Sequence, residues 1–246
     1  MGGNWDLWTF EFARAKMTRL TFDPSTEGYP VWSPDGRQIA YTANRDGSSD
    51  IFVRDADGGG AERRLTRGGG FKATLDWSRD GRFILYRGTS NSGSKLIALP
   101  LACGKAFPAL KGTANSSAGK FSPDGKWLAC TSNETGRLEI YVEAYPPPGA
   151  RWQVTTSGGS YPTWKGDGTE LFFYTSSQLF SVPVRSGPRR LDLGAARAEV
   201  RYEGPTGLLY PYDVTRDGKR FLVLEPTSLD GAELVVISNW RAGFMQ

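Results

Sequence analysis

The sequence predicts an all-β protein made of repeated antiparallel sheets, and three observations support this fold class. A six-residue pattern containing Asp-Gly recurs five times in the 246 residues, an apolar strand-like run follows each copy, and no amphipathic helix of useful length competes. The aspartates of the five copies are Asp35, Asp80, Asp124, Asp167 and Asp217, separated by 45, 44, 43 and 50 residues. A nearly constant period of this length is typical of one structural unit repeated along the chain.

Each repeat contains the same order of elements. Second strands, rich in β-branched and aromatic residues, are expected after the Asp-Gly turns at 38–42, 83–86, 127–131, 171–175 and 221–224. Third strands are expected at 50–53, 95–99, 139–142, 178–182 and 233–237. More polar fourth strands are expected at 62–66, 151–155 and 189–193, with a weaker one near 107–110. Four short strands every ~45 residues form the blade of a β-propeller, so we predict a single propeller domain over residues 1–246.

An aromatic residue precedes four of the Asp-Gly turns. These residues are Trp32, Trp77, Phe121 and Trp164. Because equivalent positions in a repeat protein usually share one packing role, we expect them to lie as wedges between neighbouring blades. A sugar-stacking platform is the functional alternative for these rings.

Two segments resemble the TolB-like propeller repeat. They are Tyr-Pro-Val-Trp-Ser-Pro-Asp-Gly-Arg-Gln-Ile-Ala-Tyr at 29–41 and Asp-Ile-Phe-Val-Arg-Asp at 50–55, and the resemblance extends over roughly residues 5–240. The closing segment 212–240 resembles the last blade of propellers that follow some bacterial serine/threonine kinases, although no kinase motif is present. The resemblance implies a bacterial propeller in a periplasmic or extracytoplasmic location, and a sensor or scaffold role detached from a kinase.

The ends of the chain leave two arrangements open. TolB-like rings typically have six or more blades, whereas this chain carries five Asp-Gly units, preceded by segments 6–10 and 17–21 that match third and fourth strands. In the preferred arrangement 17–21 completes the fifth blade, so that the chain ends are clasped and the closed ring is a monomer. In the alternative the chain is an incomplete six-bladed ring, whose open seam favours pairing with a second copy.

Composition excludes several kinds of site. The chain has no histidine, so Ser-His-Asp and Cys-His nucleophilic sites and zinc sites built on imidazole are ruled out, and we expect no metal or other cofactor. Cys103 and Cys130 are expected as buried thiols, with one disulfide as the alternative. A net charge of +4 without a basic run gives no support for a nucleic-acid partner. We expect neither a membrane span nor a signal peptide in this chain.

Candidate ligand-binding residues lie where the inner strands enter the central channel of a propeller. Tyr-Pro occurs at three of these entries, with Tyr29, Tyr161 and Tyr210, and tyrosine suits a protein, peptide or glycan ligand. The alternative is that Tyr-Pro only shapes the chain entering the strand. Asp76 and Asp213 stand at entries where the other repeats carry uncharged residues, so they are candidate ligand contacts as well.

Two functional classes follow from these residues. The preferred one is a non-catalytic binding or scaffolding module without catalytic residues. The alternative is a glycoside-active enzyme in which Asp76 and Asp213, with Glu27 as a further candidate, supply the two carboxylates that such chemistry needs about 5–10 Å apart. Against the second class, aspartates at loop positions more often cap backbone amides.

Overall fold

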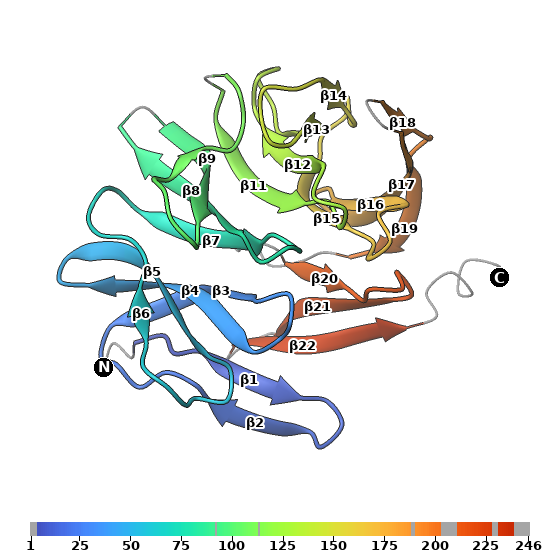
Figure 1. The fold of residues 1–246 in the computed structure, drawn as a ribbon. Coiled ribbons are helices and arrows are strands. Elements are labelled where there is room, and N and C mark those ends of the chain that lie inside the picture. Colours follow the sequence, from blue (N-terminus) through green and yellow to red (C-terminus); the bar gives the residue numbers. More distant parts are fainter. Residues whose placement is uncertain are drawn as a thin grey trace. The chain divides into compact units, whose positions relative to one another are not determined.

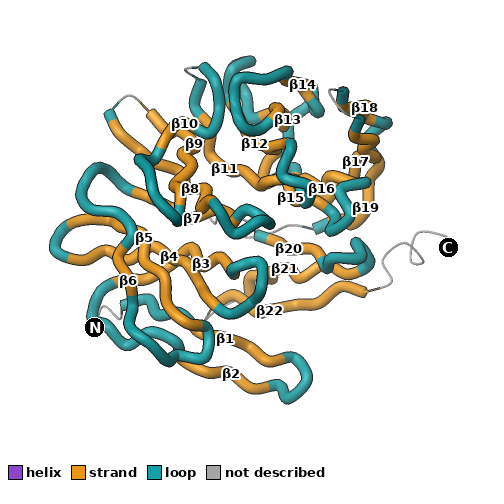
Figure 2. The backbone as a smooth tube through the Cα atoms, viewed as in Figure 1, coloured by secondary structure: helices purple, strands orange, loops and turns teal. Residues whose placement is uncertain are grey.

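The computed structural model describes residues 4–91, 93–112, 114–187, 190–202, 211–227 and 231–238, with side chains described as far as Val223. Every regular element in these ranges is a β-strand (Figures 1 and 2). The predicted all-β class is confirmed, and none of the described residues belongs to a helix able to cross a membrane. The chain divides into two compact units, Met1–Ala109 and Leu110–Gln246, which we call unit 1 and unit 2.

Unit 1 contains a hairpin followed by two four-stranded antiparallel sheets. The hairpin pairs β1 (Trp8–Glu11) with β2 (Lys16–Arg19). The first sheet has the order β3 (Thr26–Trp32), β4 (Gln38–Arg45), β5 (Ser48–Asp55) and β6 (Arg63–Arg64). The second has the order β7 (Lys72–Trp77), β8 (Phe83–Ser90), β9 (Gly93–Pro100) and β10 (Phe107–Pro108). Both sheets have the strand order predicted for a blade.

Unit 2 contains three further sheets. The first has the order β11 (Ser116–Phe121), β12 (Trp127–Ser132), β13 (Glu139–Ala144) and β14 (Arg151–Gln153). The second has the order β15 (Ser160–Trp164), β16 (Glu170–Tyr174), β17 (Gln178–Ser186) and β18 (Leu191–Leu193), and β19 (Arg197–Arg201) also pairs with β17. The third has the order β20 (Tyr212–Val214), β21 (Arg220–Thr227) and β22 (Gly231–Ser238). β19, which alternates polar and apolar residues, was not predicted from the sequence.

Hydrogen bonds in the turn between first and second strands explain the repeated Asp-Gly pattern. Before β4, Ser33 Oγ donates to Asp35 Oδ1 (2.7 Å), the amide of Arg37 donates to the same oxygen (3.0 Å), and the amide of Gln38 donates to Ser33 Oγ (2.8 Å). Gly36 has a φ of 72°, a left-handed conformation that glycine adopts at no steric cost. The same bonds recur with the pairs Ser78–Asp80, Ser122–Asp124 and Thr215–Asp217. The repeated residues therefore have a structural role.

A second repeated contact ties the fourth strand to the third. The amide of Ile51 donates to Thr66 Oγ1 (2.9 Å), and that hydroxyl donates to Asp50 Oδ1 (2.8 Å). Glu139, Ile140 and Thr155 repeat this arrangement in unit 2. In the hairpin, the amide of Leu7 donates to Thr21 Oγ1 (2.8 Å). The hairpin thus has the contacts of third and fourth strands, as predicted for 6–10 and 17–21.

Apolar side chains from adjacent sheets form the cores of both units. In unit 1 the cluster between the two sheets contains Val31, Ala40, Ile51, Val53, Trp77, Ile84, Tyr86 and Leu99. In unit 2 one cluster contains Trp127, Ala129, Ile140, Val142, Trp164, Leu171, Phe173, Val182, Val184 and Leu191. In each cluster one face of a sheet packs against the next sheet, which is how propeller blades bury their apolar residues.

The wedge prediction is confirmed for two tryptophans and is wrong for a third. Trp77 and Trp164 are buried in these clusters, and Trp164 Nε1 also donates to the Lys120 carbonyl of the preceding sheet (3.1 Å). Trp32, in contrast, is 54% exposed. Within the described part of unit 1, only the two-stranded hairpin of β1 and β2 precedes the sheet that contains Trp32. Phe121 is buried against Tyr145, with 4.8 Å between ring centroids, and its role between blades stays a prediction.

The cysteines are free, as expected, but only one of them is buried. Cys130 is buried on β12, and Cys103 is exposed in the turn after β9, which corrects the expectation of two buried thiols. The clasp between 17–21 and the last sheet would join unit 1 to unit 2. That clasp, its six-bladed alternative and the single domain over 1–246 stay predictions.

Candidate functional site

The first strand of each sheet with four or five strands is interrupted near the predicted channel entry. The register with the second strand shifts between Gly28 and Val31, Thr74 and Asp76, Ser116 and Gly119, and Ser160 and Thr163. In β3 and β15 the interruption contains Tyr-Pro, and Tyr29 and Tyr161 have φ values of 55° and 58°. Non-glycine residues rarely adopt this conformation, which costs about 1–3 kcal/mol and occurs preferentially at functional positions.

In unit 1 the strained residue presents its side chain to solvent. Tyr29 is 37% exposed, and its ring meets Phe71 edge to face with 5.7 Å between centroids. The Tyr29 carbonyl accepts a hydrogen bond from Thr74 Oγ1 of the next sheet. The guanidinium of Arg87 lies 5.8 Å from the Phe71 centroid. The Tyr29 backbone is therefore held by a hydrogen bond, and the rings of Tyr29 and Phe71 lie together near the guanidinium of Arg87.

In unit 2 the equivalent residue is held in a similar way. The amide of Tyr161 donates to Thr131 Oγ1 of the preceding sheet (3.1 Å), and its carbonyl accepts from Tyr212 Oη (2.7 Å). The Tyr161 ring is partly buried against the cluster of β16, β17 and β21. Burial raises the pKa of the Tyr212 phenol, which keeps it a donor at neutral pH. Tyr-Pro thus joins neighbouring inner strands in both units, and Tyr29 exposes its ring as well.

The two candidate aspartates lie on first strands, one in each unit. Asp76 is half-buried on β7 opposite Leu85. Asp213 is exposed on β20 and accepts a hydrogen bond from the amide of Val214 (2.8 Å), as expected of an aspartate that caps backbone. Tyr210 lies outside the described residues. The catalytic pairing of Asp76 with Asp213 stays a prediction.

Glu27, the further candidate carboxylate, is buried in an ion-pair cluster. Its Oε1 accepts from Ser25 Oγ (2.8 Å) and Arg45 Nη2 (3.2 Å), whereas Oε2 has no hydrogen-bond partner among the described residues. Arg45 and the hydroxyl of Tyr41 both donate to Glu62. Burial, followed by the bond to Glu62, raises the pKa of Tyr41. A carboxylate only 1% exposed and paired with Arg45 is suited to holding β3 against β4.

Sequence reasoning missed a second buried cluster in unit 1. Asp50 Oδ2 accepts from Arg64 Nη2 (2.6 Å) and Ser48 Oγ (2.9 Å), and its Oδ1 accepts from Thr66 Oγ1 (2.8 Å) and Lys72 Nζ (3.1 Å). Burial alone would raise the pKa of Asp50, but the bonds from Arg64, Thr66, Ser48 and Lys72 outweigh it and lower the pKa. The sequence signal that could have predicted this cluster is an acidic residue near the start of the third strand with a threonine sixteen residues later, as in Asp50 and Thr66.

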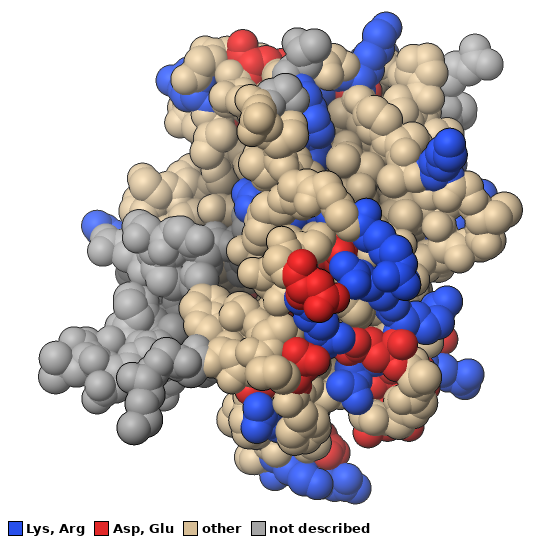
Figure 3. Space-filling model, turned by 90° about the vertical axis from the view of Figure 1, so that its left-hand side faces the viewer, with Lys and Arg blue, Asp and Glu red and all other residues tan. Residues whose placement is uncertain are grey.

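Surface charge is mixed. Acidic and basic side chains lie beside one another in the lower part of the face in Figure 3. The ion pairs Arg45–Asp23 (3.5 Å) and Arg64–Asp46 (3.5 Å) are examples in which a basic side chain lies next to an acidic one. Interleaved charges of both signs do not favour a polyanion such as nucleic acid.

Comparisons with known proteins agree with this architecture. Residues 1–107 match the family model of the TolB beta propeller domain. Tricorn protease homolog 1 of Streptomyces coelicolor is 33% identical over 244 residues, covering 93% of this chain and 22% of that protein. The chain thus spans about a fifth of this relative's length.

Two solved structures show the same fold at low sequence identity. TolB from Acinetobacter baumannii superposes with a TM-score of 0.75 at 17% identity, covering 95% of this chain and 57% of that one. A puromycin-hydrolyzing peptidase of Mycobacterium tuberculosis gives a TM-score of 0.64 at 19% identity, covering 92% and 39%. The repeated turns, the four-stranded sheets and these matches show that the chain has a TolB-like β-propeller fold.

Proposed function

We propose that the chain is a binding module that holds an extended peptide at the inner-strand entries and acts as part of a larger protein. The observation that carries this proposal is Tyr29, whose backbone is strained and fixed while its ring stays exposed beside Phe71. Two aromatic rings meeting edge to face offer apolar surface and a phenolic hydroxyl, which suits peptide side chains and backbone.

Two of the matched proteins support a peptide as the ligand. One is named a protease homolog, and one structural neighbour is a puromycin-hydrolyzing peptidase. The chain covers only 22% and 39% of these proteins, so we propose a recognition role for the module rather than the catalytic step. We also propose that residues 1–246 form one propeller. A sensor role detached from a kinase stays a prediction.

A displayed library of random peptides, selected on the immobilised chain, tests the proposal. We expect enriched peptides to bind the wild-type chain and to lose about tenfold in affinity with Tyr29→Ala, since aromatic anchors contribute strongly at interfaces. Phe12→Ala is the matched control, because Phe12 is 62% exposed at the tip of the β1–β2 hairpin. Enrichment that Tyr29→Ala leaves unchanged would refute the site.

The enzymatic alternative has its own readout. Oligosaccharides incubated with the wild-type chain should remain intact. Hydrolysis that disappears with Asp76→Asn would instead establish glycoside chemistry and overturn the binding role.

A further inference from the structure

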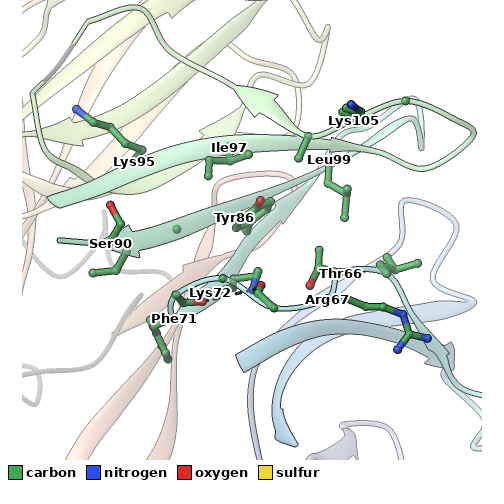
Figure 4. A pocket seen from close by; sticks show the side chains of 18 residues that line it. Thr66, Arg67, Phe71, Lys72, Tyr86, Ser90, Lys95, Ile97, Leu99 and Lys105 are labelled. Atoms are coloured by element: carbon green, nitrogen blue, oxygen red, sulfur yellow. Dashed lines mark hydrogen bonds between the residues drawn. The ribbon is translucent and has the colours of Figure 1, made fainter. Parts of the chain in front are cut away.

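A groove of about 530 Å³ lies between the two sheets of unit 1. None of the candidate ligand-binding or catalytic residues named from the sequence lines it. One side is the linker 65–72, which runs from β6 to β7. The other side is formed by β8, β9 and the turn after β9 (Figure 4). Ligand pockets typically enclose roughly 300–1,000 Å³, so the groove has the volume of a binding site.

Glycines and a short fourth strand leave the groove open. The glycines that line it are Gly68, Gly69, Gly70, Gly88 and Gly104. Gly68 and Gly69 have φ values of 66° and 81°, and a Cβ on Gly70 would lie 2.0 Å from the carbonyl oxygen of Thr89. Larger residues are therefore excluded from this wall. β6 itself is short, with only two residues, and the chain then continues as the glycine-rich linker.

The glycine wall is held in place from within the protein. Lys72 Nζ donates to the carbonyls of Ser49 (2.8 Å), Gly70 (3.3 Å) and Gly68, and to Asp50 Oδ1 (3.1 Å). The charge of Lys72 is thus used in fixing the linker, and a ligand would meet a preformed wall. Preformed sites avoid part of the ordering cost of binding.

The floor of the groove is apolar. Tyr86 is 6% exposed and Leu99 is 8% exposed, and Ile97 lies between Lys95 and Leu99 in the view of Figure 4. Ile97 and Leu99 share one side of β9, because alternate residues of a strand point to the same face. Of these three side chains Ile97 is the most accessible, because Tyr86 and Leu99 also belong to the core cluster of unit 1.

The rim of the groove is basic. Arg67 and Lys105 are exposed and form no ion pair with any residue in the described ranges, and Lys95 lines the same groove. Figure 4 places Lys95 near one end, and Lys105 and Arg67 near the other. No Asp or Glu is among the lining residues. Positive charge at both ends of an apolar floor complements a ligand with the opposite pattern.

We propose that this groove binds an extended peptide segment in which carboxylate side chains flank an apolar stretch. Lys95 and Leu99 are four residues apart on one strand, or ~13 Å, which is the length of about four residues of extended peptide. The apolar side chains of such a segment cover Tyr86, Ile97 and Leu99, and its carboxylates face the basic rim. Phe71 lines this groove and also meets the ring of Tyr29, so the groove adjoins the Tyr29 site and the proposal rests on the proposed peptide-binding role.

Fluorescence anisotropy with labelled five-residue peptides tests the proposal on the complete chain. The probes are Glu-Leu-Phe-Leu-Glu, the neutral Gln-Leu-Phe-Leu-Gln, and Glu-Ser-Gly-Ser-Glu, which keeps the charges without the apolar stretch. The variant is Arg67→Glu with Lys105→Glu, and the matched control is Arg79→Glu, an exposed arginine in the turn after β7. All three positions are at the surface, so thermal unfolding should show folded proteins.

We expect Glu-Leu-Phe-Leu-Glu to bind the wild-type chain most tightly of the three probes. Its affinity should be about tenfold weaker for the Arg67→Glu, Lys105→Glu variant and should change by less than about twofold for Arg79→Glu. Raising the salt concentration should weaken binding. Equal binding of the three probes, no binding of the acidic apolar probe, or an unchanged affinity in the double variant would each overturn the proposal.

Discussion

The buried carboxylate Asp50 should be one of the most sensitive positions of the chain. Asp50→Asn keeps the shape of the side chain but removes the negative charge that faces Lys72 Nζ at 3.1 Å and Arg64 Nη2 at 2.6 Å. The Asp50 side chain is 0% exposed and that of Lys72 is 9% exposed, so solvent cannot replace the lost countercharge. Breaking a buried pair of this kind costs about 3–5 kcal/mol.

Urea unfolding followed by tryptophan fluorescence measures this loss at neutral pH. Asp46→Asn is the matched control, because Asp46 also pairs with Arg64 (3.5 Å) but its side chain is 85% exposed. An exposed pair contributes less than about 1 kcal/mol, so the control should remain close to wild type. A loss below about 1 kcal/mol for Asp50→Asn would refute the reasoning.

The pH dependence gives a second test of Asp50. Since the folded state lowers the pKa of Asp50, its contribution is complete above the unfolded value, about 3.9, and is lost as the pH falls through the folded value. The wild-type chain should therefore lose stability below about pH 4 more steeply than Asp50→Asn. Parallel profiles would show that Asp50 titrates equally in both states.

Three further perturbations test packing, reactivity and turn structure. In urea unfolding, Trp164→Ala should lower the free energy of unfolding by about 3–5 kcal/mol, because Trp164 is buried, whereas Trp32→Ala should lower it by less than about 1 kcal/mol. Equal losses would contradict the buried position of Trp164 and the exposed position of Trp32. Burial raises the pKa of the Cys130 thiol to about 12, so a thiol reagent at pH 8 should modify only Cys103 in the folded chain. Modification of both cysteines would contradict the burial of Cys130. Ser78→Ala should cost about 1–3 kcal/mol, because it removes the acceptor of a backbone amide, and unchanged thermal unfolding would contradict this role.

The elements were predictable because the repeat contains its own local hydrogen bonds. Ser33 and Asp35 satisfy the turn within six residues, so the pattern can be recognised without any tertiary contact. The exposure of Trp32 was not predictable, because it depends on which strands precede the sheet. The contacts of Asp50 come from residues up to 22 positions away, and their chemistry appears only after the strands are paired.

The candidate site was predictable only in part. Tyr-Pro lies at the interruptions of β3 and β15, whereas β7 and β11 are interrupted without it. The left-handed conformation of Tyr29 and its contact with Thr74 of the next sheet were not predicted. The groove between the sheets was not predicted, because the glycine-rich linker 65–72 becomes a wall only where β8, β9 and the turn after β9 lie opposite it.

The most direct test of the proposed function is the affinity of a library-selected peptide for the wild-type chain and for Tyr29→Ala, measured by isothermal titration calorimetry. Phe12→Ala, tested beside them, controls for the loss of an exposed aromatic ring elsewhere in unit 1. A peptide-binding module anchored at Tyr29 predicts about a tenfold weaker affinity in Tyr29→Ala alone. Equal affinities for all three proteins would contradict it.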